Sequence, residues 1–193
     1  MPGDSPSVVI LAGPNGAGKT TASPFVIRDT LGIREFVNAD HIAQGLSGFA
    51  PETTAIAAGR IMLGRLHELG RKRATFAFET TLATRSFAPW LRGLREDGYT
   101  VRLVFLALPT PELAIGRVRL RVSQGGHDVP EAVIRRRFRR GLTNLFGLYA
   151  EIANEWSIYD SSGATPRAVY ESEPGTTETI HDAEQLEALK RLA

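Results

Sequence analysis

The stretch VVILAGPNGAGKT, residues 8–20, decides the fold of this chain. Its first five residues are apolar, as in a strand that is buried on both faces. The next eight fit the pattern G-x-x-x-x-G-K-[ST] of a phosphate-binding P-loop. Glycines let such a loop turn tightly, so that successive backbone N–H groups point at one spot, and the following helix adds the positive end of its dipole. We therefore predict a nucleotide-binding site here, the alternative being a glycine-rich turn without a ligand.

Two side chains of the loop have predicted chemical roles. Lys19 is expected to reach the outer phosphates of ATP, and the Thr20 hydroxyl is expected to ligate a phosphate-bound Mg²⁺. The loop does not identify the acceptor of the phosphate, so water, a protein, a sugar and a nucleotide all stay open. The residues predicted to bind the nucleotide are Gly13, Pro14, Asn15, Gly16, Ala17, Gly18, Lys19, Thr20 and Thr21.

Length and composition indicate one globular domain, residues 1–193. The chain is 42% apolar and 23% charged, which is ordinary for such a domain, and the lack of cysteine excludes disulfides and cysteine-bound metals. The sequence shows neither a signal peptide nor a membrane span, so we expect a cytoplasmic location. The net charge is +2, yet residues 117–140 hold eight Arg against Asp128 and Glu131, a local +6. That concentration favours a local anion site over a surface that coats nucleic acid.

Strand-like and helix-like stretches alternate along the chain, which is typical of an α/β domain. This order predicts the three-layer fold of P-loop NTPases, with a mostly parallel sheet. Strands are predicted at residues 7–12, 34–38, 75–78, 100–108, 157–160 and 167–170. Helices are predicted at residues 19–30, 51–73, 86–96, 112–122 and 131–153, with a loop at 171–182 and a last helix from about 183.

Two carboxylates follow strands and are expected at the crevice where ligands bind such sheets, outside the carboxyl ends of the strands. Asp40 is the candidate base that orients and deprotonates an acceptor hydroxyl; its alternative role is the N-cap of a helix that starts at His41. Glu79 is a candidate to hold Mg²⁺ through water or to bind the acceptor; its alternative role is a buried acid bonded to loop amides. Thr80 and Thr81 are expected either to bind the substrate or to cap the next turn.

Two arginine-bearing helices are joined by QGGHDVP, residues 124–130. Phosphoryl transfer builds negative charge, which the planar guanidinium stabilises through paired hydrogen bonds, and the glycines allow such a hairpin to close. We predict a lid over about residues 117–140. The alternatives are a solvated basic helix face and a nucleic-acid patch. His127 is expected to hold the turn, with a phosphate contact as the alternative.

The lid arginines are assigned by their place on the helices. On a helical wheel Arg136 lies opposite the apolar stripe of its helix, and Arg137 lies on the flank of that stripe. Arg121 and Arg136 are predicted to take part in catalysis, and Arg117 and Arg137 to bind nucleotide phosphates. The pattern leaves open which of the four touch phosphate.

Taken in order, these motifs resemble the zeta-toxin-like P-loop kinases, in the compact branch often labelled a predicted ABC-type ATPase. The resemblance covers about residues 8–146 and is carried by GPNGAGKT, by Asn38-Ala39-Asp40, by Phe78-Glu79-Thr80-Thr81 and by the arginine hairpin. It implies phosphorylation of the 3′-hydroxyl of the amino sugar in UDP-N-acetylglucosamine, with ATP and Mg²⁺, and an antitoxin protein as a possible partner. The chain is shorter than the well-studied zeta toxins, and the region that helps to hold the sugar nucleotide there has little counterpart here.

The same resemblance implies a role for each motif. Lys19 and Thr20 match the phosphate and Mg²⁺ residues, and Asp40 matches the catalytic base. Glu79 matches the substrate-binding acid. The less definite matches are Thr80 or Thr81 as its hydroxyl neighbour and, in the lid, Arg117, Arg121, Arg136 and Arg137.

We therefore expect a monomeric, ATP-dependent kinase of a small molecule, with a UDP-sugar as the leading acceptor and no membrane partner. One alternative is a P-loop NTPase that acts as a motor or switch, although the Asn-Lys-x-Asp motif of GTPases is absent. The other is a kinase of nucleotides or nucleic-acid ends that uses the basic hairpin, against which the low net charge argues.

Overall fold

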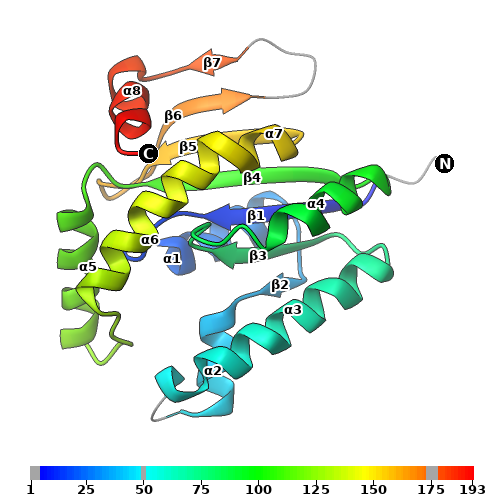
Figure 1. Ribbon diagram of the computed structural model, residues 1–193, viewed down its shortest axis with the longest axis horizontal. Coiled ribbons are helices and arrows are strands. Elements are labelled where there is room, and N and C mark those ends of the chain that lie inside the picture. Colours follow the sequence, from blue (N-terminus) through cyan, green and yellow to red (C-terminus); the bar gives the residue numbers. More distant parts are fainter. Residues whose placement is uncertain (1–4, 49–50, 173–177) are drawn as a thin grey trace.

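The protein is described by a computed structural model over residues 5–48, 51–172 and 178–193. Its centre is a seven-stranded sheet in the order β2-β3-β1-β4-β5-β6-β7 (Figure 1). The pairs from β2 across to β5 are parallel, whereas β6 and β7 pair antiparallel. The predicted α/β fold with a mostly parallel sheet is confirmed. The strands are β1 (Ser7–Ala12), β2 (Phe36–Val37), β3 (Phe76–Thr80), β4 (Thr100–Ala107), β5 (Glu155–Asp160), β6 (Arg167–Ser172) and β7 (Thr179–Ile180).

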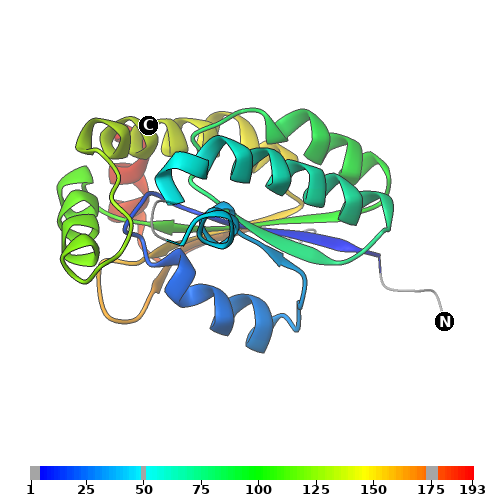
Figure 2. The same cartoon turned by 90° about the horizontal axis from the view of Figure 1, so that it is seen from below.

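Helices cover both faces of the sheet (Figure 2). α3, α4 and most of α6 lie on one face and α1 lies on the other, while α5 and the start of α6 stand together beyond the end at which β1, β3 and β4 finish (Figures 1 and 2). The helices are α1 (Lys19–Ser23), α2 (Ala39–Leu46), α3 (Ala55–Arg71), α4 (Phe87–Glu96), α5 (Pro111–Ser123), α6 (Glu131–Asn144), α7 (Ala150–Ile152) and α8 (Ala183–Arg191). Residues Pro51–Thr54 form a 3₁₀ turn, and Pro24–Thr30 and Leu145–Tyr149 form π-helical segments.

The first strand lies at the centre of the core. β1 is flanked by β3 and β4, and its residues from Val8 to Ala12 are all buried, as expected for a parallel strand covered on both faces. The aromatic side chains of Phe76, Phe78 and Phe105 fill the layers beside it. The P-loop therefore starts from a fully buried strand at the middle of the sheet.

Two predicted helices change their hydrogen-bond register part of the way along. The predicted helix 19–30 is α1 followed by a π-helical segment, which begins at Pro24 because proline has no N–H to donate. The predicted helix 131–153 is α6, a second π-helical segment and α7. An i to i+5 register places residues five apart on the same side, and Asn144 and Tyr149 accordingly both bond the loop after β3.

Three shorter elements differ from the sequence expectation. Residues 39–46 form the complete helix α2, which the pattern shows only from His41. β3 continues to Thr80, so Glu79 lies inside the strand. Part of the predicted loop 171–182 is strand, because β6 reaches Ser172 and β7 pairs with it, while residues 173–177 lie outside the described chain. Both residues of β7 are exposed, so no buried alternation marks that strand in the sequence.

Candidate active site

The P-loop runs from β1 to α1 through glycines whose φ is positive. At Gly13 (φ 140°) an added Cβ would lie 2.3 Å from the carbonyl oxygen of Leu106 in β4. At Gly16 (φ 79°) it would lie 2.8 Å from the carbonyl oxygen of Ala114 in α5. Neither position has room for a side chain, so these glycines hold the loop against both the sheet and the first helix of the hairpin.

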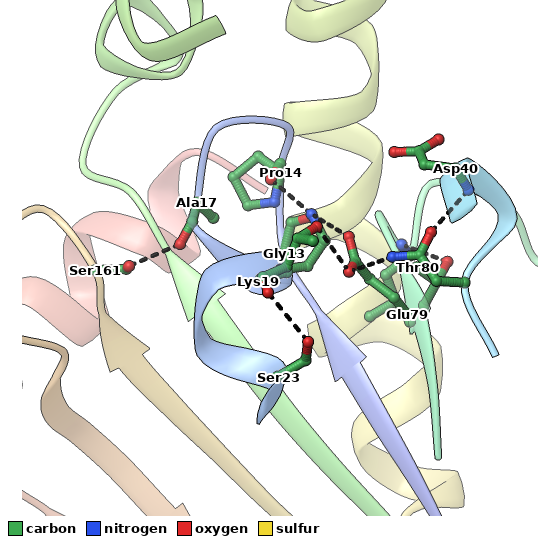
Figure 3. A network of polar contacts seen from close by, with 12 residues as sticks. Gly13, Pro14, Ala17, Lys19, Ser23, Asp40, Glu79, Thr80 and Ser161 are labelled. Carbon is green, nitrogen blue, oxygen red and sulfur yellow. Dashed lines mark hydrogen bonds and ion pairs between the residues drawn. The ribbon is translucent and has the colours of Figure 1, made fainter. Parts of the chain in front are cut away.

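Lys19 is a buried cation at the start of α1, with 6% of its surface exposed. Its Nζ donates to the carbonyl oxygens of Gly13 and Pro14, both at 2.9 Å, and lies 3.7 Å from Glu79 Oε1 (Figure 3). The ammonium group is thus held inside the loop whose amides are predicted to bind phosphate.

Four further charged groups act on that ammonium. Burial lowers the pKa of Lys19; the carboxylates of Glu79 and Asp40 oppose this shift, and the guanidinium groups of Arg121 and Arg137 add to it. The structure therefore brings charged side chains from α1, α2, β3, α5 and α6 within electrostatic range of Lys19, in a region that we call the crevice. A phosphate bound beside Lys19 would favour its charged form.

Glu79 is held by two side chains, whereas the alternative prediction for it is a buried acid bonded to loop amides. Its Oε2 accepts hydrogen bonds from Thr20 Oγ1 at 3.2 Å and from Asn38 Nδ2 at 2.7 Å. β3 positions it, because Glu79 is paired in register with Leu11 at the end of β1, next to the start of the P-loop. The acid and the two predicted Mg²⁺ and phosphate residues, Thr20 and Lys19, are therefore in direct contact.

The N-cap of α2 is Asn38, so the alternative role of Asp40 as the cap is wrong. Asn38 Oδ1 accepts the N–H groups of Asp40 at 2.7 Å and of His41 at 3.3 Å, while the other end of the same amide binds Glu79. The helix starts at Ala39, two residues earlier than the sequence pattern indicates, because an Asn at the end of a strand is itself a strong cap. Asp40 is left with an exposed carboxylate at the rim of the crevice, on the side of Glu79 (Figure 3).

The loop after β3 is fixed by the helix that lies over it. Thr80 Oγ1 accepts the N–H of Leu82, which has a φ of 59°, so Thr80 stabilises the turn as its alternative role predicted. Asn144 Nδ2 donates to the Leu82 carbonyl at 2.8 Å. Thr81 is half-buried, and its carbonyl oxygen would lie 2.7 Å from a Cβ added at Gly141 of α6. The two threonines are thus parts of a rigid wall beside Glu79.

The two arginines of α5 have different surroundings. Arg117 donates to the carbonyl oxygens of Ser161 at 2.7 Å, Ser162 at 2.6 Å and Gly16 at 3.4 Å, so it ties the P-loop to the loop after β5. Arg121 donates to the His127 carbonyl at 2.6 Å, and its Nε is buried with no hydrogen-bond partner in the structure. Arg121, which lowers the pKa of Lys19, makes one hydrogen bond to the described backbone, whereas Arg117 bonds three backbone carbonyl groups.

The two adjacent arginines of α6 lie on different sides of the helix, as the wheel predicts. Arg137 is half-buried, and Asp40 opposes the lowering of its pKa by burial. Arg136 is exposed and lines a groove on the outer face of α6 with Arg139 and Arg140. The crevice therefore holds Arg121 and Arg137, and Arg136 is not among the groups that act on Lys19.

The loop after β5 belongs to the site although no sequence motif marks it. Ser161 is buried, and its Oγ donates to the carbonyl oxygen of Ala17 at 2.7 Å. Together with the Arg117 bonds, this contact fixes the far side of the P-loop. Serine and glycine residues after a strand carry no chemical signature, so only the fold shows their role.

Two cavities flank the P-loop helix. The first has a volume of about 690 Å³ and is mostly apolar; it is lined by Gly18, Thr21, Ala22, Phe25, Val26, Arg117, Tyr159 and the 161–166 loop. The second has a volume of about 730 Å³ and lies between α1, the approach to β2, and α2; it is lined by Thr20, Ser23, Ile27, Arg28, Arg34, Phe36 and His41. The first suits a flat apolar group and the second an anionic or hydroxylated one, because two guanidinium groups and an imidazole border it.

The donor set at Thr20 fits Mg²⁺. A hydroxyl and a carboxylate oxygen lie 3.2 Å apart there, and Mg²⁺ binds proteins through one or two such oxygens while phosphates and water complete its shell. Among the described residues no group of three or more His, Asp or Glu gathers as a metal cage. None of the helices in the described residues has the length and apolar character that crossing a bilayer requires.

Comparison with known proteins gives one sequence relative and a set of solved structures. An uncharacterized protein of Haemophilus influenzae is 28% identical over 130 residues, which are 67% of this chain and 91% of that protein. The crystal structure described as AvrRxo1-ORF1:-ORF2 with ATP has a TM-score of 0.74 and 17% identity over 97% of this chain, but this chain spans only 64% of that one. A structure from the PezAT chromosomal toxin–antitoxin system of Streptococcus pneumoniae has a TM-score of 0.64 and 20% identity. That match covers all of this chain and 87% of the PezAT chain.

At these identities the solved structures show a shared fold. The family assignment rests on the sequence itself, which matches the family described as Zeta toxin over residues 1–172. That match leaves only the segment from residue 173 onward outside it, and this chain therefore belongs to the zeta toxin family.

Proposed function

We propose that this protein transfers the γ-phosphate of ATP to a hydroxyl group of a small molecule. The observation that carries the proposal is the Asp40 carboxylate. It makes no hydrogen bond within the described chain, yet it acts electrostatically on both Lys19 and Arg137. A carboxylate in this position is suited to accept the proton of an acceptor hydroxyl placed between it and the P-loop.

The P-loop side of the crevice is the proposed donor site. The loop amides and Lys19 bind the β- and γ-phosphates, and Arg121 and Arg137 stabilise the charge that builds during transfer. The apolar cavity of about 690 Å³ is the proposed place of the nucleoside, because it adjoins Gly18, Thr21 and Arg117. The AvrRxo1-ORF1:-ORF2 structure that shares this fold is described with ATP, which supports the choice of nucleotide.

In the proposed reaction the γ-phosphorus forms one bond and loses one bond. With Asp40 accepting its proton, the acceptor oxygen bonds to the γ-phosphorus while the bond from that phosphorus to the bridging oxygen of ADP breaks. Thr20, directly, and Glu79, through water, would hold Mg²⁺, which supplies charge neutralisation on the phosphates. Asn38 keeps Glu79 in place for that role.

The proposed acceptor is a sugar nucleotide, with UDP-N-acetylglucosamine as the leading candidate. The cavity of about 730 Å³ supports this choice, because it lies against Thr20 and His41 and has Arg34 at its border for a phosphate-bearing group, while Arg28 there is paired with Asp29. A protein partner of the antitoxin kind is also proposed, since PezAT, which shares the fold, is described as a toxin–antitoxin system.

The test is incubation of the protein with ATP, Mg²⁺ and UDP-N-acetylglucosamine, with mass spectrometry to find one added phosphate. Asp40→Asn is expected to abolish transfer and to leave ATP affinity nearly unchanged, while Lys19→Ala is expected to lose both. Asp97→Asn, the same change at a distant exposed acid, serves as the control. ATP hydrolysis of equal rate with and without acceptors from a metabolite extract would contradict the kinase proposal and favour a simple NTPase.

A further inference from the structure

The outer face of α6 carries a row of arginines that phosphate transfer leaves unused. With Arg191 at the end of α8 they border a cavity of about 740 Å³, which we call the arginine groove. Thr143 Oγ1 donates to the Ala193 carbonyl oxygen at 2.5 Å, so the end of α8 is fixed against α6 and forms the second wall. The groove is lined by Pro111, Arg135, Arg136, Phe138, Arg139, Arg140, Arg191, Leu192 and Ala193.

The positive charge of the groove is largely uncompensated. Arg135 donates to Glu112 Oε1 at 2.6 Å. Arg136, Arg139 and Arg140 form no ion pair with any described carboxylate. The whole chain has a net charge of only +2, so this concentration is a local feature.

The arrangement is unfavourable for the helix by itself. Arg135 and Arg139, and likewise Arg136 and Arg140, are four residues apart on one helix, and like charges at that spacing repel. An acidic residue at either position would stabilise α6. Stability of the fold therefore does not account for the row, whereas an anionic ligand in the groove does.

The shape and surroundings of the groove favour an acidic peptide over a nucleic acid. Its aromatic residue, Phe138, is 5% exposed and offers no face on which a base can stack. Exposed Glu184 on α8, and to a lesser extent Glu187, which pairs with Lys190, would repel any anion that continued beyond the groove, so the occupant is short. Pro111 and partly exposed Leu192 add apolar surface, which suits the side chains of a peptide.

We propose that the arginine groove binds a short acidic segment of a partner protein, outside the phosphate-transfer crevice. Carboxylates of the segment would pair with Arg136, Arg139 and Arg140 in the bidentate geometry of guanidinium groups. Because α6 also carries Arg137 on its inner side, the occupant would contact the same helix that lines the crevice.

The test is fluorescence anisotropy of a labelled hexaglutamate peptide titrated with the full chain, beside a labelled heptathymidylate that has six phosphates. We expect the peptide to bind more tightly than the oligonucleotide and its affinity to fall as salt rises. Arg139→Glu with Arg140→Glu should weaken peptide binding at least tenfold. Arg92→Glu, an exposed charge reversal on α4, is the control and should change it less than twofold.

Each other outcome overturns the proposal. These are equal or tighter binding of the oligonucleotide, no peptide binding at millimolar protein, and peptide affinity that survives the double substitution. Since the substitutions remove a like-charge repulsion, the melting temperature should not fall. If the Glu pair nevertheless fails to fold, Arg139→Gln with Arg140→Gln gives the same comparison with a smaller loss, of severalfold.

Discussion

Asn38 joins two parts of the site through one amide group. Its oxygen caps α2, which carries Asp40, and its nitrogen holds Glu79 on β3. The side chain is 4% exposed, so water is not available to replace either bond. A single residue thereby fixes the distance between the proposed base and the proposed Mg²⁺-holding acid.

Asn38→Ala should therefore lower both stability and phosphate transfer. Loss of a cap and of a bond to a charged group predicts a decrease of about 2 kcal/mol in the free energy of unfolding. Turnover should fall on the order of tenfold for each 1.4 kcal/mol that the displacement of Asp40 and Glu79 adds to the activation free energy. Asp182→Ala removes the N-cap of α8, far from the crevice, and is the matched control. It should cost about 1 kcal/mol of stability and leave turnover per folded molecule unchanged. Equal losses of turnover in the two variants would exclude a specific role for Asn38.

The buried ammonium of Lys19 predicts a pH dependence of ATP binding. Burial lowers its pKa, so in alkaline buffer Lys19 loses its charge before an exposed lysine does, and the bound phosphate would restore that proton. ATP affinity should fall as the pH rises toward the ordinary lysine range, and binding there should take up a proton. Calorimetry in buffers of different ionisation enthalpy measures this uptake. Asp40→Asn removes an opposing carboxylate, so the fall should begin at lower pH in that variant.

At the scale of elements, α6 is the part that sets one wall of the crevice. Gly141 lets this helix approach the carbonyl oxygen of Thr81, and Asn144 bonds the same loop from the next turn. Arg137, one turn earlier on α6, then faces Asp40. The position of the arginine thus depends on how closely the helix packs.

Gly141→Ala should separate α6 from the loop after β3. The added Cβ would lie 2.7 Å from the Thr81 carbonyl oxygen, and relieving that contact should cost about 1–3 kcal/mol of stability and reduce transfer. Gly116→Ala is the control in α5, where an added Cβ meets nothing within 4 Å. It should raise stability by up to about 1 kcal/mol. Urea denaturation of both variants checks the contrast, and similar stability in the two would show that α6 yields without strain.

The elements that the sequence predicts well are those whose signals are local. The P-loop, the apolar strands and the wheel position of Arg137 depend on neighbouring residues and were recovered from them. The partners of Arg117 were not, because Ser161 and Ser162 lie 44 and 45 residues further along the chain. The same limit hides the cap of α2, where Asn38 and Asp40 compete as local signals and only the contact with Glu79 distinguishes them.

At the scale of the whole molecule, the crevice gathers residues from both halves of the chain onto one sheet. A nucleotide bound there as proposed would contact the first helix, the hairpin and the loop after β5 at once. Ligand binding that is specific to the folded state stabilises it by mass action, so ATP should stabilise the entire domain.

ATP with Mg²⁺ at a hundredfold excess over its dissociation constant should add about 2.7 kcal/mol to the free energy of unfolding. For a domain of this length that corresponds to a rise of roughly 5–11 °C in the melting temperature. Differential scanning calorimetry should show one transition, as the single-domain prediction requires. Lys19→Ala should melt without any shift, and a second transition insensitive to ATP would contradict the single domain.

The bonds of Arg117 have a consequence for how the protein is made. Residues 13–20 leave the ribosome before their partners, because the carbonyl groups of Gly16 and Ala17 are bonded by residue 117 and residue 161. β1 likewise waits for β3 and β4 on either side. A nascent chain shorter than about 160 residues therefore carries the whole P-loop sequence without the packing that shapes it, and we expect the growing polypeptide to hold a nucleotide only after residue 161 has been added.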